Sequence, residues 1–315
     1  MIFDQLENPL RIKITGKCNR NCFFCHREGG MDIDDIDING KWKTSIEGIS
    51  TAFGIRTVAI TGGEPFCHRD FLSLLNGISQ CQGIDRISIT TNGTIEKEEL
   101  FWAKAKNYGL YKVNISMPEI LTSIDSEGGV DLTNSPFSVQ LRTINKLYEA
   151  GIRVKLNCAI FNDYFYSALI LKSLLNLEHV DIVLLPNISN QKTFDYSWEI
   201  IERLLCEFHF KEIGVRRRYH TSDTLLKYEN RQGQKVDVKT TKYDNFFFEQ
   251  LCFNCPIKDQ CQEGFYGIRM EQRGGEPYVR LCLHRSDKGV MMPIEAFMNS
   301  KIRTALEGLW VHAEK

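Results

Sequence analysis

Hydrophobic residues recur in short runs through the first two-thirds of the chain, and stretches with helical spacing separate these runs. The runs are rich in β-branched residues and end at Gly, Asn or Pro, which is typical of buried strands. They predict strands at residues 10–15, 56–61, 86–91, 111–116, 152–160 and 180–185. The intervening stretches predict amphipathic helices at residues 42–53, 71–80, 97–108, 139–150, 164–177 and 196–208.

Six strand–helix units in a row predict a parallel α/β sheet, either doubly wound or curled into a barrel. The alternation ends near residue 214. Three short strands are then predicted at 216–219, 225–228 and 236–239, followed by strands at 266–271 and 278–283 and a helix over 293–309. We therefore expect an α/β domain over residues 1–215 and a small α+β extension over residues 216–315.

Composition places the chain among ordinary globular proteins. Of its 315 residues, 43% are hydrophobic and 25% are charged, which excludes wholesale disorder. No apolar run reaches the roughly 18 residues of a membrane helix, and no signal peptide opens the chain. The formal net charge of −1 argues against a nucleic-acid or anionic-membrane partner. We expect a cytoplasmic protein with no membrane or nucleic-acid binding.

Eleven cysteines are unusual for such a protein, because a reducing compartment disfavours a disulfide framework. Seven of them fall into two tight clusters, which points to metal binding. The other four, Cys67, Cys81, Cys158 and Cys206, are scattered and are expected to be small buried hydrophobic residues.

The first cluster, Cys18, Cys22 and Cys25, directly follows the first predicted strand. In a parallel α/β barrel this end of the strand carries the active site. Three thiolates in this spacing can hold three irons of a [4Fe–4S] cluster and leave the fourth iron open, as a catalytic metal requires. A zinc knuckle completed by His26 is the alternative for this stretch alone.

Gly62, Gly63 and Glu64 directly follow the second predicted strand. Paired glycines let backbone approach a ligand closely, and the adjacent carboxylate can pair with an ammonium group, although a plain turn is also consistent. Together with the cysteine loop, this segment resembles the radical S-adenosylmethionine (SAM) superfamily. The resemblance implies a partial (β/α)6 barrel, a [4Fe–4S] cluster on the three cysteines and SAM, with its ammonium group on Glu64.

The same resemblance implies the chemistry and further SAM contacts. In that superfamily one electron from the cluster cleaves SAM, and the 5′-deoxyadenosyl radical then abstracts a substrate hydrogen. The aromatic Phe24 fits the cysteine motif, and Thr91, Ser116 and Asn157 lie where the family places polar contacts. The Asn-Gly pair after Thr91 is also a good turn on its own, and Ser116 is consistent with capping its strand.

The second cluster contains Cys252, Cys255, Cys261 and Cys282. Four thiolates can close a zinc site or hold a second [4Fe–4S] cluster. In a chain that also carries a radical-SAM motif we favour an auxiliary iron–sulfur cluster. We expect all four cysteines to be ligands, which leaves no iron open to substrate.

Residues 10–19 and 266–283 look like segments of the molybdenum-cofactor GTP cyclase family. This resemblance implies that Arg11, Arg269 and Arg280 contact the substrate, although surface positions are also consistent. Within the arginine run at 216–218, alternation lets either the middle residue or the outer two face inward. The chain departs from the cyclases, which use three auxiliary cysteines and a Gly-Gly terminus. Its Cys-x2-Cys-x5-Cys spacing is instead similar to peptide-modifying relatives.

The leading hypothesis is a radical SAM enzyme that abstracts hydrogen from a small polar substrate, nucleotide-like if the arginines point inward. Such an enzyme requires a one-electron donor of the flavodoxin or ferredoxin type. The alternatives are a peptide-modifying radical SAM maturase and, from a different class, an iron–sulfur redox sensor or electron carrier. A carrier needs neither an open iron nor the Gly-Gly-Glu segment.

Overall fold

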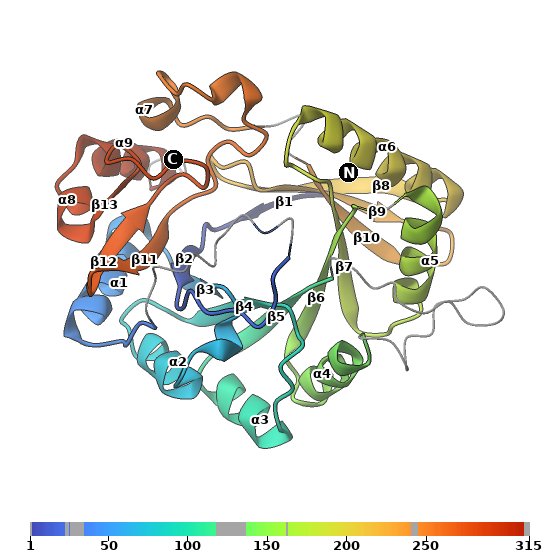
Figure 1. The fold of residues 1–315 in the computed structure, drawn as a ribbon, viewed down its shortest axis with the longest axis horizontal. Coiled ribbons are helices and arrows are strands. Elements are labelled where there is room, and N and C mark those ends of the chain that lie inside the picture. Colours follow the sequence, from blue (N-terminus) through green and yellow to red (C-terminus); the bar gives the residue numbers. More distant parts are fainter. Residues whose placement is uncertain are drawn as a thin grey trace.

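Thirteen strands of the described chain form one sheet, which curves into a barrel with helices around its outside (Figure 1). The computed structural model describes residues 2–22, 25, 35–117, 137–161, 163–240 and 245–311. The curved sheet with helices around it confirms the α/β barrel expected from the sequence. None of the described helices has the length and apolarity that spanning a bilayer requires.

Six neighbouring parallel strands form the largest part of the barrel wall, and a helix follows each of them. The strands are β2 (Leu10–Lys13), β3 (Thr57–Thr61), β4 (Arg86–Thr91), β5 (Leu110–Ser116), β6 (Arg153–Ala159) and β7 (Val180–Leu185). The helices are α1 (Gly40–Phe53), α2 (Phe71–Ser79), α3 (Glu99–Asn107), α4 (Ser138–Glu149), α5 (Tyr164–Leu175) and α6 (Gln191–Glu207), with a short 3-10 turn, η1 (Pro65–Cys67), before α2.

The predicted boundaries agree within a few residues except at the start of α6. The sequence predicts a start at residue 196, but the helix begins at Gln191. Asn190 and Thr193 form a reciprocal capping box, in which each side chain accepts a hydrogen bond from the other residue's backbone N–H at 3.0–3.1 Å. This cap extends the helix beyond its hydrophobic stripe.

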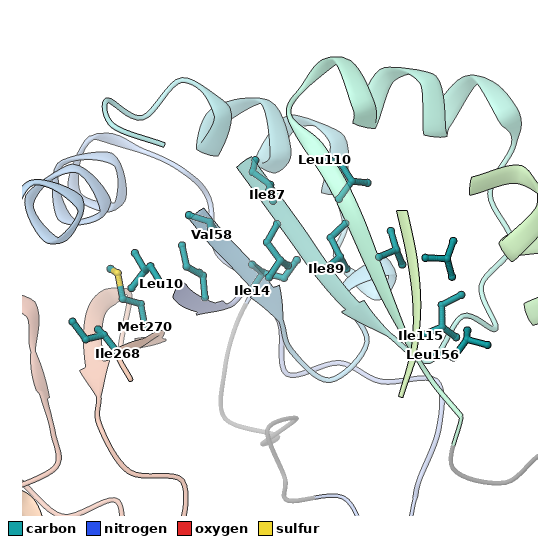
Figure 2. Close-up of a cluster of buried hydrophobic side chains, with 14 of the residues drawn as sticks. Leu10, Ile14, Val58, Ile87, Ile89, Leu110, Ile115, Leu156, Ile268 and Met270 are labelled. Atoms are coloured by element: carbon teal, nitrogen blue, oxygen red, sulfur yellow. The ribbon is translucent and has the colours of Figure 1, made fainter. Parts of the chain in front are cut away.

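The two faces of each strand carry different residue types. Buried aliphatic residues such as Ile87 and Ile89 belong to the hydrophobic cluster of Figure 2, which Met270 joins from the C-terminal region. The alternate residues Ser88 and Thr90 line an interior cavity, because successive side chains of a strand point to opposite faces. Burying each such aliphatic side chain stabilises the fold by about 1.5–3 kcal/mol, so the apolar face can hold the wall while the inner face remains polar.

The sequence pattern predicts no strand before residue 10, but Ile2–Leu6 forms β1, parallel to β8 (Lys211–Arg218). The segment reads IFDQL, which has no period-two alternation and therefore gives no strand signal. β8 pairs antiparallel with β9 (Thr224–Glu229), and β10 (Lys235–Thr240) pairs with both β9 and β7. These strands continue the barrel wall past β7.

Contacts of the end of β8 and the turn after it with the β1–β2 link close the barrel. The side-chain amide of Asn8 donates a hydrogen bond of 2.9 Å to the carbonyl oxygen of Tyr219, and Arg218 donates one to the carbonyl oxygen of Glu7. The last third of the chain is thereby attached to its beginning.

The C-terminal region attaches to the barrel through β2, the strand that leads into the cysteine loop. Its elements are α7 (Glu249–Cys252), η2 (Lys258–Gln260), β11 (Arg269–Arg273), β12 (Glu276–Arg280), β13 (Met291–Pro293), α8 (Ile294–Met298) and α9 (Lys301–Trp310). β11 pairs parallel with β2, while β12 and β13 follow antiparallel. The helix predicted over 293–309 is split, because the Ser300 hydroxyl caps a new helix by accepting a hydrogen bond from the Arg303 N–H at 3.1 Å.

Candidate active site

The cysteine loop lies at the carboxyl end of β2. Cys18 and Cys25 are exposed, and Cys22 is half-buried. The backbone N–H of Arg20 donates to the Cys18 sulfur at 3.4 Å, and that of Cys25 donates to the Cys22 carbonyl oxygen at 3.1 Å. The loop therefore turns back on itself, with two thiols presented at its surface. The expected SAM contact Phe24 lies outside the described residues.

Gly62 and Gly63 pack against the backbone that leads into this loop. The N–H of Gly63 donates to the Thr15 carbonyl oxygen at 2.9 Å, and that of Glu64 donates to the Lys17 carbonyl oxygen at 2.7 Å. A Cβ atom on Gly63 would lie 2.2 Å from the Lys17 oxygen. Glycine is thus required by the close approach of two backbone segments, and this approach places Glu64 beside the cysteine loop.

The carboxylate of Glu64 is fully buried. Its Oε1 accepts hydrogen bonds from the Thr91 hydroxyl at 2.7 Å and the Phe66 N–H at 3.1 Å, and its Oε2 accepts one from the Asn92 N–H at 2.7 Å. Burial raises the pKa of Glu64, and these hydrogen bonds oppose the rise. A carboxylate has about four acceptor sites, so one remains for a further donor such as an ammonium group. Thr91 positions this carboxylate.

A cavity of about 400 Å³ occupies the barrel interior, and both Ser116 and Asn157 line it. These two residues are register partners at the carboxyl ends of β5 and β6. Lys112 and Lys155 lie on the same inner faces nearer the amino ends of the two strands and also line the cavity. At about 3.3 Å per residue, Lys112 is about 13 Å from Ser116 along β5.

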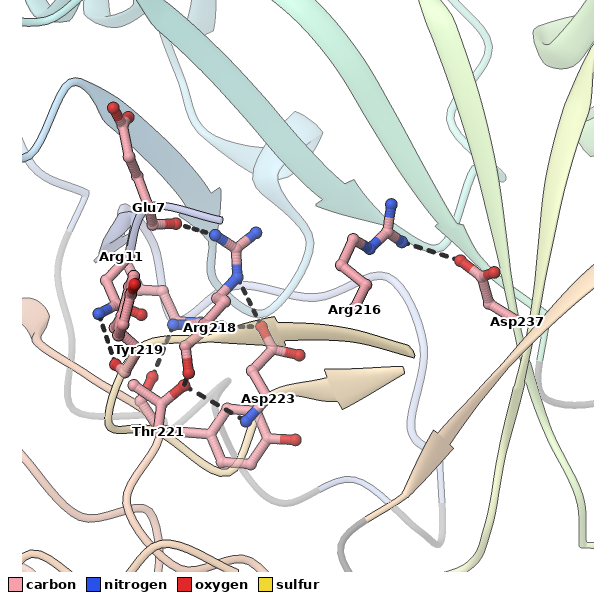
Figure 3. Close-up of polar contacts among 10 residues, drawn as sticks. Glu7, Arg11, Arg216, Arg218, Tyr219, Thr221, Asp223 and Asp237 are labelled. Carbon is pink, nitrogen blue, oxygen red and sulfur yellow. Dashed lines mark hydrogen bonds and ion pairs between the residues drawn. The ribbon is translucent and has the colours of Figure 1, made fainter. Parts of the chain in front are cut away.

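The cavity is strongly cationic. Among the described residues that line it, two are acidic, Asp223 and Glu263, while the cationic ones are Arg11, Lys112, Lys155, Arg218, Lys239 and Arg269. The Asp223 carboxylate accepts a hydrogen bond from Arg218 at 2.9 Å and contacts Arg11 at 3.5 Å (Figure 3). Burial alone would raise the pKa of Asp223, but Arg218, Lys239 and Arg11 hold it well below its usual value.

Lys112 and Lys155 make no ion pair with any residue in the described ranges. Burial, reinforced by Lys155 and Arg218, lowers the pKa of Lys112 to about 7. Burial also lowers the pKa of Lys155 to about 8, against the opposing attraction of Asp223. Lys112 and Lys155 are both half-buried, and two such ammonium groups without an ion-paired carboxylate create a local demand for an anion.

The three arginines expected at the substrate are not all in one place. Arg11 and Arg269 line the cavity, whereas Arg280 donates to the carbonyl oxygens of Cys282 at 2.8 Å and Leu283 at 2.5 Å. Its guanidinium also pairs with Glu271 at 3.6 Å. Arg280 therefore braces the turn that carries the last cysteine and is not part of the described cavity lining.

Within the arginine run at 216–218, the outer two residues face inward and the middle one does not. Arg218 lines the large cavity, Arg216 pairs with Asp237 at 2.8 Å (Figure 3), and Arg217 is exposed. Lys112, Lys155 and Lys239 were not among the residues expected from the sequence. The sequence does contain a signal for them, because each lysine lies at one of the polar positions that alternate with apolar positions along its strand.

The four C-terminal cysteines line one small cavity of their own. Burial and the neighbouring thiols raise the pKa of Cys252 to about 11, so this thiol is protonated at neutral pH unless a bound positive ion holds the thiolate form. The N–H of Gly264 donates to the Cys261 sulfur at 3.3 Å. Within the described ranges, no three His, Cys, Asp or Glu side chains are grouped so that they could hold a single metal ion.

Residues 12–169, half of the chain, match the family model described as the Radical SAM superfamily. The protein therefore belongs to the radical SAM superfamily and is an enzyme. Membership implies a [4Fe–4S] cluster and SAM. The observed site fits them: three thiols occupy one surface loop, and a buried carboxylate beside it keeps one acceptor site.

The curated proteins to which the chain is similar include two probable GTP 3′,8-cyclases. It is 38% identical over 158 residues to the Sulfolobus acidocaldarius protein, covering 50% of this chain and 48% of that one. It is 27% identical over 294 residues to the Sulfurisphaera tokodaii protein, covering 91% and 85%. The first match thus spans about half of its relative's length, and the second spans most of it.

The fold is also similar to that of a solved structure, Streptococcus suis SuiB bound to S-adenosylmethionine. The TM-score is 0.52 at 13% identity, and the match covers 96% of this chain and 66% of that chain. At this identity the likeness concerns the fold alone, and it agrees with the barrel.

Proposed function

We propose that the protein cleaves SAM at the carboxyl face of the barrel and directs the radical at a small anionic substrate of the nucleotide type, with GTP as the specific candidate. Cys18, Cys22 and Cys25 hold the [4Fe–4S] cluster, which supplies the electron for cleavage. Glu64 receives the ammonium group of SAM, and Ser116 and Asn157 contact SAM from the ends of β5 and β6.

The cationic cavity is the observation that carries the substrate class. Six cationic and two acidic side chains from the described residues line it, and Lys112 and Lys155 lack ion-pair partners among those residues. A phosphorylated substrate would pair with them and with Arg11 and Arg269, because phosphate suits both ammonium and guanidinium groups. The similarity to probable GTP 3′,8-cyclases supports GTP as the first substrate to test.

The proposal includes an auxiliary [4Fe–4S] cluster on Cys252, Cys255, Cys261 and Cys282, in the C-terminal region that follows β10. Its support is geometric. The four thiols share one cavity, and their sequence neighbours Glu263 and Leu283 line the large cavity. An auxiliary cluster at this position lies beside the substrate, with all its irons held by protein. The exposed edge of the first cysteine loop suits a one-electron donor of the flavodoxin or ferredoxin type.

The test uses anaerobically reconstituted full-length protein with dithionite and SAM. The proposal expects 5′-deoxyadenosine to form, and added GTP to be consumed with formation of a 3′,8-cyclised nucleotide. Raised salt should weaken GTP binding. Vigorous SAM cleavage that leaves GTP untouched would reject GTP as the substrate, while protein that binds iron but never cleaves SAM would reject the assignment of the cysteine loop.

A further inference from the structure

We propose that Glu263 selects the base of the substrate by accepting hydrogen bonds from two adjacent N–H donors, which for GTP are the N1–H and the 2-amino group of guanine. Glu263 has this role only if the proposed function holds, because the role requires a nucleotide substrate. It is then a specificity-determining residue for the reaction.

Glu263 is one of two acidic residues among the described residues that line the large cavity. The other, Asp223, accepts a hydrogen bond from Arg218 at 2.9 Å and contacts Arg11 at 3.5 Å. Asp223 is thus engaged by two guanidinium groups of the protein. Glu263 is 6% exposed, and no arginine engages its carboxylate in the same way within the described ranges.

The one ion pair of Glu263 within the described ranges is with His284. Its Oε2 lies 3.2 Å from the imidazole Nε2, but no hydrogen bond of good geometry reaches this buried oxygen from a described residue. The ammonium group of Lys239, which lines the same cavity, lies instead over the ring of Tyr266, 4.2 Å from its centre. A carboxylate has about four acceptor sites and is costly to bury without donors, so Glu263 favours a ligand that brings N–H groups.

The surroundings of Glu263 suit a base better than a phosphate. Leu283 directly precedes His284 in the chain and also lines the cavity, so an apolar side chain lies beside the carboxylate. A phosphate would be repelled by Glu263, whereas guanine offers it two parallel N–H donors and offers Leu283 the face of its ring. The unpaired cations that suit a phosphate, Lys112 and Lys155, come from β5 and β6.

The proposed auxiliary cluster adds a reason for a protein side chain to recognise the base. Glu263 follows Cys261 by two residues, and Leu283 follows Cys282 directly. If all four cysteines are ligands, no iron is open to the base at this end of the cavity. The hydrogen-bonding edge of the base must then be read by a side chain, and Glu263 is the buried acceptor placed there.

A purely structural role for Glu263 predicts a different outcome. Through His284, the carboxylate links the segment of Cys261 to the segment of Cys282. A residue that only forms this link would change the iron content, or would change the affinity for every nucleotide alike. The order of affinities among nucleotides is therefore the decisive measurement, and the iron content is the control.

The experiment measures the binding of GTP, ITP and XTP to anaerobically reconstituted full-length protein by equilibrium dialysis. ITP lacks the 2-amino group of GTP, and XTP has a carbonyl oxygen in its place. The unmodified protein should bind GTP about tenfold to a hundredfold more tightly than ITP, because ITP lacks one hydrogen bond to a charged group. XTP should bind more weakly still, because its 2-oxo group faces the carboxylate.

Glu263→Gln should reverse this order. The amide oxygen still accepts the N1–H, while the amide N–H donates to the 2-oxo group of XTP and meets the 2-amino group of GTP. The affinity for GTP should therefore fall about tenfold or more, and XTP should become the tightest ligand of the three. The exposed Glu295 of α8 provides the matched control Glu295→Gln, which should keep the original order.

Equal affinities for GTP and ITP in the unmodified protein would overturn the proposal, as would a Glu263→Gln protein that keeps the original order at equal iron content. If Glu263→Gln fails to bind iron, the three affinities of the unmodified protein decide. A protein that cyclises GTP but does not distinguish it from ITP would overturn the role of Glu263 alone. A protein that cleaves SAM and binds none of the three nucleotides would overturn the nucleotide substrate as well.

Discussion

The side chains of Asn19 and Asn92 are joined by a hydrogen bond of 2.9 Å, donated by the Asn92 amide. Asn19 directly follows Cys18, and the backbone N–H of Asn92 donates to Glu64. One residue of the β4 turn thus connects the cysteine loop with the buried carboxylate. The relative placement of the two parts of the candidate site is fixed by the protein's own hydrogen bonds.

The first prediction concerns the three N-terminal cysteines. Changing Cys18, Cys22 and Cys25 together to Ala should lower the iron content from about eight to about four per chain, since each cluster contains four irons. It should also abolish 5′-deoxyadenosine formation. Cys206→Ala, at an exposed cysteine of α6, serves as the control and should change neither. Residual SAM cleavage in the triple variant would show that the loop was assigned wrongly.

Glu64→Gln should weaken SAM binding while the cluster remains. A charge-assisted hydrogen bond contributes about 1.5–3 kcal/mol. At about 1.4 kcal/mol per factor of ten, the affinity should fall roughly tenfold to hundredfold. Equilibrium dialysis of SAM against reconstituted protein measures this, with the exposed Glu99→Gln as the matched control. An unchanged affinity would leave the Gly-Gly-Glu segment as a turn without a role in SAM binding.

Two glycine substitutions should change the stability of the protein in opposite directions. Gly63→Ala would force a Cβ to within 2.2 Å of the Lys17 oxygen, so the two loops must separate, and both stability and SAM affinity should fall. Gly48→Ala, inside α1, meets only a Met298 methyl at 3.9 Å and should stabilise the protein by about 0.5–1 kcal/mol. Urea unfolding of the two apo variants checks the signs, and a Gly63→Ala protein with normal stability and SAM affinity would contradict the close-approach argument.

GTP affinity should decrease as the pH rises from 6.5 to 9. Lys112 and Lys155 lose their protons near pH 7 and 8 in the free protein, and a bound anion favours their charged forms, so binding takes up protons. Isothermal titration at constant ionic strength, in buffers with different ionisation heats, measures both effects. Lys112→Met combined with Lys155→Met should flatten the dependence. A pH-independent affinity in the unmodified chain would place the anion elsewhere.

The same two lysines should make the free energy of unfolding increase with pH, whereas they make GTP affinity decrease. Their pKa values lie below the ordinary 10.5 in the folded state, so the unfolded chain binds more protons between about pH 7 and 10.5. Their contribution to the free energy of unfolding therefore increases with pH across that window. Urea titrations of the apo protein against the double Met variant would isolate the contribution, and a decrease with pH would contradict it.

Local patterns account for what the sequence predicted well. The six strand–helix units follow from hydrophobic periodicity, and the cysteine loop and Glu64 meet because parallel strands end at the same edge of a sheet. The cationic cavity could not be predicted in this way. Lys112 and Lys155 lie on the neighbouring strands β5 and β6, and Lys239 lies on β10, which joins β6 through β7. The strand order and the face of each strand, which the sequence does not give, bring the three into one cavity. The role of Arg280 could not be predicted either. No sequence pattern shows that its guanidinium hydrogen-bonds to the turn that contains Cys282 and therefore does not line the cavity.

The barrel is closed by strands from the last third of the chain, and this affects how the substrate cavity can change during evolution. The superfamily signature spans residues 12–169, and that stretch contains the cysteine loop and Glu64. Arg218, Lys239 and Arg269 come from β8, β10 and β11, on the other arc of the wall. Mutations confined to this later arc can reshape the proposed substrate cavity while the cysteine loop and Glu64 remain unchanged.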